Sequence, residues 1–273
     1  MHAKTEQADD WNAAFYARHS SLQEAMAEEV MSLLSLKGME SVLDVGCGDG
    51  HLTARIADRL PHGAALGVDA SADMIAFATA HFARGGSEGR SNLAFEVADA
   101  RALGHSRSCD LLVSFNALHW VPEQADALRG IAAALRPGGQ AMLRMVAKGS
   151  VTSLEEVAER TRATLRWAGY FSGFEDPYLR LTPADYAALA SAQGLRVAHQ
   201  VTHLREWDFK THDAFFGFCS AGFGAWTLRL PEALRDAFVN EVVEAYRAAN
   251  QRSADRANVF GFYQMDITLV PAS

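Results

Sequence analysis

Residues 41–50 (Ser-Val-Leu-Asp-Val-Gly-Cys-Gly-Asp-Gly) constrain the fold more than any other stretch of this chain. A short apolar run ends abruptly at three glycines spaced two apart, and apolar residues at helical spacing follow. The pattern predicts a strand, a tight loop and a helix. Because glycine reaches φ > 0 freely and has no Cβ, such a loop can turn sharply and let a ligand lie against bare backbone.

Glycine spacing and charge indicate which ligand this loop holds. The dinucleotide pattern G-x-G-x-x-G would need glycine at position 51, where the chain has His51. A pyrophosphate favours backbone N–H groups without nearby carboxylates, whereas Asp44 and Asp49 lie in or beside the loop. These acids favour the sulfonium and ammonium groups of S-adenosylmethionine (SAM). A nicotinamide oxidoreductase and a tight turn in an unrelated α/β protein are the alternatives.

The loop resembles motif I of the class I SAM-dependent methyltransferases, which reads roughly D-x-G-x-G-x-G and is matched by Asp44, Gly46, Gly48 and Gly50. The resemblance implies that these four residues, together with Cys47 and Asp49, contact SAM. It also implies a Rossmann-like α/β fold with a seven-stranded, mostly parallel sheet.

Acidic residues mark the ends of the first three predicted strands, at Asp44, Asp69 and Asp99. A β-α-β order places these ends at one rim of a parallel sheet, where open α/β folds bind ligands. Asp69 can accept hydrogen bonds from both ribose hydroxyls there. An acid at a helix N-terminus is the alternative, which is weakened because Ser71 can serve as the N-cap.

The resemblance also assigns residues around these acids. In the family, an acid in the place of Asp99 receives the adenine amino group, and Met74 would pack on the adenine face, with a core methionine as the alternative. The predicted cofactor site is completed by Ala70, Ala100 and Asn116.

A helix is predicted before the first strand, because apolar residues recur at helical spacing from Leu22 to Leu34. Its beginning looks like the N-terminal cover of small-molecule methyltransferases, in which an aromatic residue and a glutamine close over the cofactor. That resemblance assigns Tyr16 and Gln23 to SAM and His19 to the methyl acceptor. Packing of these side chains against the core is the alternative.

Residues 116–121 (Asn-Ala-Leu-His-Trp-Val), after the fourth predicted strand, resemble those of the trans-aconitate and malonyl-carrier-protein carboxyl methyltransferases. The resemblance covers about residues 11–147. His119 is a candidate general base with an ordinary pKa near 6.5, or a satisfied loop histidine. His119 and Trp120 are also candidates for contact with the acceptor. Arg144, in an apolar strand, is a candidate cation for an anionic acceptor, or the partner of a neighbouring acid.

One domain is expected over residues 1–273, with residues 11–147 as the cofactor-binding half and helical lid insertions at 148–182 and 210–257. Of the 26 aromatic residues, 18 follow residue 150. The excess indicates an apolar acceptor pocket, for which Trp167 and Tyr170 are candidates, or packing within the lid itself. Two aromatic segments there resemble, more weakly, carboxyl methyltransferases of juvenile hormone acids.

The predicted activity is methyl transfer from SAM to a carboxylate on an apolar small molecule or carrier-bound chain. O-, N- or C-methylation of a secondary metabolite and SAM binding without methyl transfer are the alternatives. A net charge of −8 without a Lys/Arg run argues against nucleic acid and anionic membranes. Three cysteines without metal spacing and no long apolar run favour a cytoplasmic protein without a metal, as a monomer or homodimer.

Overall fold

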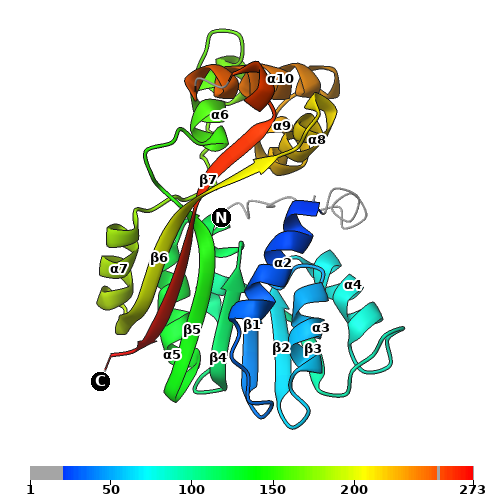
Figure 1. The fold of residues 1–273 in the computed structure, drawn as a ribbon, viewed down its shortest axis with the longest axis vertical. Coiled ribbons are helices and arrows are strands. Elements are labelled where there is room, and N and C mark those ends of the chain that lie inside the picture. Colours follow the sequence, from blue (N-terminus) through cyan, green and yellow to red (C-terminus); the bar gives the residue numbers. More distant parts are fainter. Residues whose placement is uncertain (1–20, 251–252, 273) are drawn as a thin grey trace, which may run out of the picture.

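The computed structural model describes residues 21–250 and 253–272. Its framework is a seven-stranded sheet in the order β3-β2-β1-β4-β5-β7-β6 (Figure 1). The strands are β1 (Ser41–Val45), β2 (Ala64–Asp69), β3 (Leu93–Val97), β4 (Cys109–Phe115), β5 (Leu135–Ala147), β6 (Leu195–Asp208) and β7 (Val259–Pro271). Strands β1 to β5 pair in parallel, and β7 runs antiparallel to both β5 and β6. The predicted Rossmann-like, mostly parallel sheet is confirmed.

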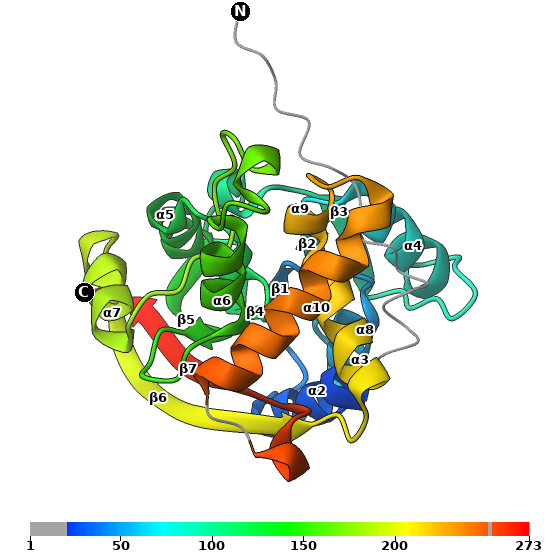
Figure 2. The same cartoon turned by 90° about the horizontal axis from the view of Figure 1, so that it is seen from above.

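Alternation along the central strands gives the sheet two apolar faces, because successive side chains of a strand point to opposite sides. Val42 packs with helices α2 (Ser21–Leu33), α3 (His51–Asp58) and α4 (Ala72–Phe82), whereas its neighbour Leu43 packs with α5 (Gln124–Ala134) and α7 (Pro183–Ala192). The helices therefore cover both faces of the sheet (Figure 2).

A helical cap sits over the carboxyl ends of the central strands (Figures 1 and 2). It consists of α6 (Leu154–Arg162), η3 (Ala168–Tyr170), α8 (His212–Gly222), α9 (Gly224–Thr227) and α10 (Glu232–Ala249). These elements fall within the ranges expected for lid insertions, and their action as a lid stays a prediction. The cap has its own aromatic core, which includes Trp226 and Phe238.

Two long antiparallel strands, β6 and β7, connect the sheet to the cap. Strand β6 pairs with β7 from Leu195 opposite Pro271 to Asp208 opposite Val259, so the pair extends beyond the parallel strands to the cap (Figure 1). No helix in the described part of the chain is long and apolar enough to cross a bilayer.

Candidate active site

The three glycines of the loop after β1 have different surroundings. All three have positive φ, at 77°, 54° and 80° for Gly46, Gly48 and Gly50. A Cβ at Gly46 would clash with Ala117, and one at Gly50 would meet the ring of Phe95, whereas one at Gly48 would have nothing within 4 Å. Gly46 and Gly50 thus allow close packing, and Gly48 leaves open space against bare backbone, as a bound ligand needs.

Asp69 joins the glycine loop to helix α4. One carboxylate oxygen accepts the backbone N–H of Gly48 at 2.9 Å, and the other accepts that of Ser71 at 2.9 Å. Ser71 caps α4, as predicted, by accepting the N–H of Met74. Because each carboxylate oxygen has two acceptor positions, Asp69 keeps capacity for hydroxyl donors from a ligand above the loop.

Asp44 is turned away from the space above the loop. Its side chain is 2% exposed and accepts a 2.6 Å hydrogen bond from the Thr53 hydroxyl. Burial raises the pKa of this carboxyl to about 7, against the opposing effect of the Thr53 hydrogen bond and with a further rise from the charge of Asp69. The Asp44 carboxylate thus ties β1 to helix α3, and its contact with a cationic cofactor stays a prediction. The buried thiol of Cys47 likewise points inward, beside Gly67.

The other predicted cofactor residues lie along the same rim. Asp99 caps the short helix η1 (Ala100–Ala102) and binds its own neighbour Arg101 at 2.6 Å, which lowers the pKa of the Asp99 carboxyl. Asn116, with φ of 57°, donates its backbone N–H to the Arg144 carbonyl. Met74 is buried, which is the core packing left open by the sequence.

Five further predicted cofactor and acceptor residues differ in how far the structure describes them. Ala70 and Asp49 are exposed beside the loop. Tyr16 and His19 lie outside the described residues, as does the side chain of Gln23, whose backbone belongs to α2.

His119 is enclosed between the rim and the cap. It lies in η2 (Leu118–Trp120), is 5% exposed, and its Nδ1 accepts the Val146 backbone N–H at 3.4 Å. Its ring packs on Tyr178 at 4.7 Å and near Trp120 at 5.8 Å between ring centroids. Burial, aided by the charge of Arg180, lowers the pKa of His119 to about 3. The imidazole is therefore neutral at pH 7 and a weak base.

Arg144 forms a buried ion pair with Asp266. The guanidinium is 1% exposed and binds Asp266, its neighbour across β7, at 2.6 and 2.8 Å. A longer contact of 3.3 Å reaches Glu29 of helix α2, and Glu29 also pairs with Arg205 of β6. Arg144 thus pairs with a neighbouring acid, the alternative that the sequence left open, and its contact with an acceptor stays a prediction.

The two aromatic candidates in the cap differ in exposure. Trp167 is 1% exposed, donates its indole N–H to Glu241 at 3.0 Å and packs edge-on against Phe238. Trp167 thus packs within the cap, the alternative for the aromatic residues there, and its contact with an acceptor stays a prediction. Tyr170, at the end of η3, is exposed.

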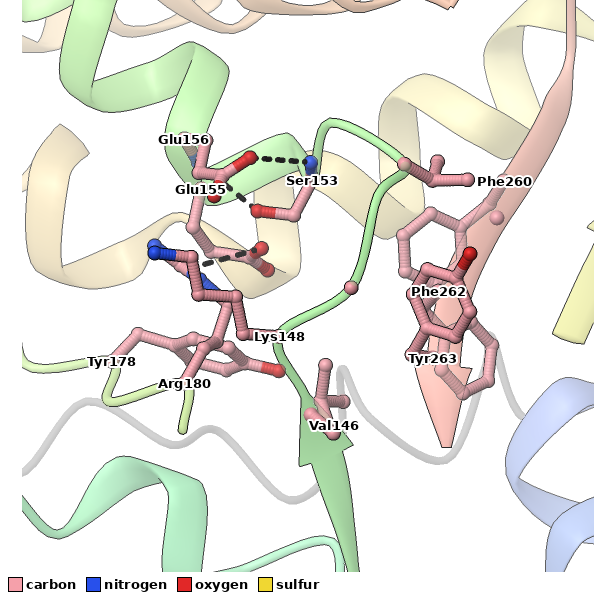
Figure 3. A pocket seen from close by; sticks show the side chains of 14 residues that line it. Val146, Lys148, Ser153, Glu155, Glu156, Tyr178, Arg180, Phe260, Phe262 and Tyr263 are labelled. Atoms are coloured by element: carbon pink, nitrogen blue, oxygen red, sulfur yellow. Dashed lines mark hydrogen bonds and ion pairs between the residues drawn. The ribbon is translucent and has the colours of Figure 1, made fainter. Parts of the chain in front are cut away.

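A pocket at the junction of sheet and cap was missed by the sequence reasoning (Figure 3). Its walls come from the end of β5, the start of α6, residues 178–180 and the start of β7. They include Lys148, Glu155, Tyr178, Arg180 and Tyr263. Residues 173–182 carry no motif or periodic pattern, so only an arginine within a polar, aromatic segment could have drawn attention to this region.

Comparison with known proteins identifies the class. Residues 42–139 match the family model described as a methyltransferase domain. The chain is 32% identical over 187 residues to a trans-aconitate 2-methyltransferase of Deinococcus radiodurans, covering 67% of this chain and 69% of the relative. It is 32% identical over 225 residues to one of Methylobacterium nodulans, covering 82% and 74%. A match to the enzyme of Methylobacterium radiotolerans spans 49% of that relative.

The chain therefore belongs to the class I SAM-dependent methyltransferases, to the type represented by the trans-aconitate 2-methyltransferases. Its cofactor is SAM, and the prediction of a methyltransferase is confirmed. The fold is also that of Haemonchus contortus phosphoethanolamine N-methyltransferase 2, solved with phosphomonomethylethanolamine and S-adenosylhomocysteine. That likeness has a TM-score of 0.60 at 16% identity and covers 99% of this chain and 59% of the other.

Proposed function

We propose that the protein transfers the methyl group of SAM to a carboxylate oxygen of a small molecule, giving a methyl ester. The observation that carries this proposal is the neutral, enclosed His119. Among the residues after β4, His119 was the candidate base, and its pKa of about 3 leaves it poorly suited to remove a proton.

The free energy of transferring a proton from the acceptor to His119 favours a carboxylate over a phenol or amine as the acceptor. A phenol has a pKa of about 10, so transferring its proton to a group with a pKa of about 3 is uphill by about 7 units, or roughly 9 to 10 kcal/mol. A carboxylic acid with a pKa of about 4 is already ionised at pH 7. No proton then needs to be moved during methyl transfer.

The remaining task of the protein is alignment and exclusion of water. When bound, SAM would supply a methyl group activated by its sulfonium: the acceptor oxygen would bond to the methyl carbon as the carbon–sulfur bond breaks, and the electron pair of that bond would leave on sulfur. The open backbone at Gly48 and the carboxylate of Asp69 would hold the cofactor, with Asp99, Ala100 and Asn116 along the same rim. Helix α2 and the cap would cover the site.

The relatives support the same class of acceptor. Their names specify trans-aconitate, a molecule with carboxylates. The aromatic-rich cap of this chain keeps an acid on an apolar molecule as a second possibility within that class. An O-, N- or C-methyltransferase of a secondary metabolite is the competing function.

The product distinguishes these functions. The protein is incubated with SAM labelled in its methyl group and a panel containing trans-aconitate, decanoate, a phenol and an aliphatic amine, and the products are treated with mild alkali. Label released as methanol from an acid product is the expected result. Alkali-stable label on the phenol or amine, with none on the acids, would contradict the proposal.

A further inference from the structure

We propose that Arg180 anchors the carboxylate of the acceptor in the pocket between the sheet and the cap. This inference rests on the proposed carboxylate chemistry and adds the residue that recognises the substrate. The pocket is lined by Arg180 and Lys148 on one side and by aromatic residues of β7 on the other (Figure 3). It encloses about 20 Å³, room for a water molecule or one end of a carboxylate.

The pocket lies next to the cofactor rim. Gly46 of the glycine loop packs so closely on Ala117 that a Cβ would not fit. Two residues further on, His119 accepts the N–H of Val146 and packs on Tyr178, and both of those residues line the pocket. The short segment 117–119 therefore contacts both the loop after β1 and the wall of the pocket, which places the pocket beside the cofactor rim.

Arg180 contacts its acidic partners at longer distances than the buried Arg144 does. Arg144 makes two short bonds to Asp266, at 2.6 and 2.8 Å. Arg180 is also enclosed, with a side chain 11% exposed, but its contacts to Glu155 and Asp176 are 3.4 and 3.5 Å. A guanidinium has five N–H donors in a planar fork that matches a carboxylate. The guanidinium of Arg180 lies over the Tyr178 ring, 5.2 Å from the ring centroid, and this contact orients its N–H donors.

The two acids beside Arg180 are poor permanent partners. Burial raises the pKa of Glu155 and of Asp176, against the opposing effect of Arg180 itself. Burial thus disfavours the charged form of both carboxyls beside Arg180. An acceptor carboxylate that replaces Glu155 at Arg180 would keep the site electrically balanced, and exposed Lys148 adds positive charge beside it.

The alternative is that Arg180 and Glu155 only tie α6 to the segment before α7. The two roles predict different results for two matched substitutions. If Arg180 is an anchor and Glu155 its competitor, Arg180→Gln should weaken acceptor binding, whereas Glu155→Gln should strengthen it or leave it unchanged. If the ion pair is only structural, both substitutions should weaken acceptor binding, because either one removes the contact between Arg180 and Glu155.

The experiment uses the full chain and the acid of the panel with the highest kcat/KM. Its dissociation constant is measured by calorimetry in the presence of S-adenosylhomocysteine, and its KM and kcat by turnover. Arg180→Gln should raise the dissociation constant and KM by about 10- to 100-fold, as expected for a lost charge-assisted bond, with a smaller change in kcat. Arg166→Gln is the control, because Arg166 pairs with Glu241 rather than with Glu155 or Asp176.

Affinity for SAM, measured on each variant, reports whether the protein is folded. An unchanged acceptor constant in Arg180→Gln, or losses of equal size in Arg180→Gln and Glu155→Gln, would overturn the anchor while leaving the ester chemistry intact. If wild-type protein forms methyl esters and only Arg180→Gln loses affinity for the acid, the anchor is supported. If wild-type protein binds none of the acids, both the anchor and the proposed function are overturned.

Discussion

Acidification should destabilise the folded protein through His119. Its pKa is about 3 in the folded state and about 6.5 in an unfolded chain, so the unfolded state takes up a proton first as the pH falls. The stabilising contribution is present above pH 6.5 and is lost between pH 6.5 and 3. At pH 5 the unfolded imidazole is nearly fully charged, and the free energy of unfolding should be about 2 kcal/mol lower than at pH 8 from this residue alone.

This magnitude does not depend on the exact folded value. At pH 5, any folded pKa below about 4 gives nearly the same loss, because the folded imidazole is then neutral and the loss depends on the unfolded pKa. Asp44 acts in the opposite direction, since its pKa is raised to about 7 and its contribution is lost as the pH rises through that value. The contributions of these two residues therefore largely cancel between pH 5 and pH 8.

Replacement of His119 isolates its contribution. In His119→Asn the amide oxygen can take the place of Nδ1 as acceptor for the Val146 N–H, but nothing titrates. Urea unfolding at pH 8 and pH 5 should show that wild-type protein loses about 2 kcal/mol more than the variant, because Asp44 is common to both. Equal losses would mean that His119 is charged in the folded protein, and the argument against a base would fail with it.

Three further predictions test the cofactor site. Asp69→Ala should weaken the affinity for SAM at least about tenfold by calorimetry. Asp49→Ala, which removes a carboxylate from the glycine loop, should change that affinity less than about threefold. Equal effects would show that only net charge matters. Gly48→Val should abolish measurable SAM binding because its side chain fills open space over the loop, and Gly85→Val, at a similarly open surface position with positive φ, should bind SAM normally. Removal of residues 1–20 should raise the SAM dissociation constant strongly while far-UV circular dichroism stays native; normal binding would contradict the predicted cover.

The half of the chain before residue 147 could be predicted because its signals are local. The glycine loop, the N-cap at Ser71 and the acids at strand ends all depend on residues a few positions apart, which fix backbone conformation and the direction of each strand. Parallel pairing then follows from the β-α-β order. The class of cofactor could be inferred from the same short stretch.

The acceptor side could not be predicted because its contacts join distant segments. Arg144 was expected to meet an anion, but its partner Asp266 lies 122 residues later and becomes its neighbour only when β7 pairs antiparallel with β5. Trp167 is an aromatic residue of a type common in binding pockets, yet its place in the cap core depends on its contacts with α10. The pocket around Arg180 needs four separate segments to be packed before it exists.

The three acids at the strand ends show that their sequence pattern predicts their positions but not their charge states. Asp44, Asp69 and Asp99 look equivalent in the sequence, and the structure places all three at the ends of parallel strands. Their surroundings then separate them: Asp44 is buried with a pKa of about 7, so it is neutral in about half of the molecules at pH 7, whereas Asp99 has a lowered pKa beside Arg101. Charge complementarity to a cationic cofactor would therefore depend most on Asp69, and Asp44→Asn should weaken SAM binding far less than Asp69→Asn. Calorimetry on these two variants tests that division, and a larger loss in Asp44→Asn, with Thr53 still in place and the fold intact, would refute it.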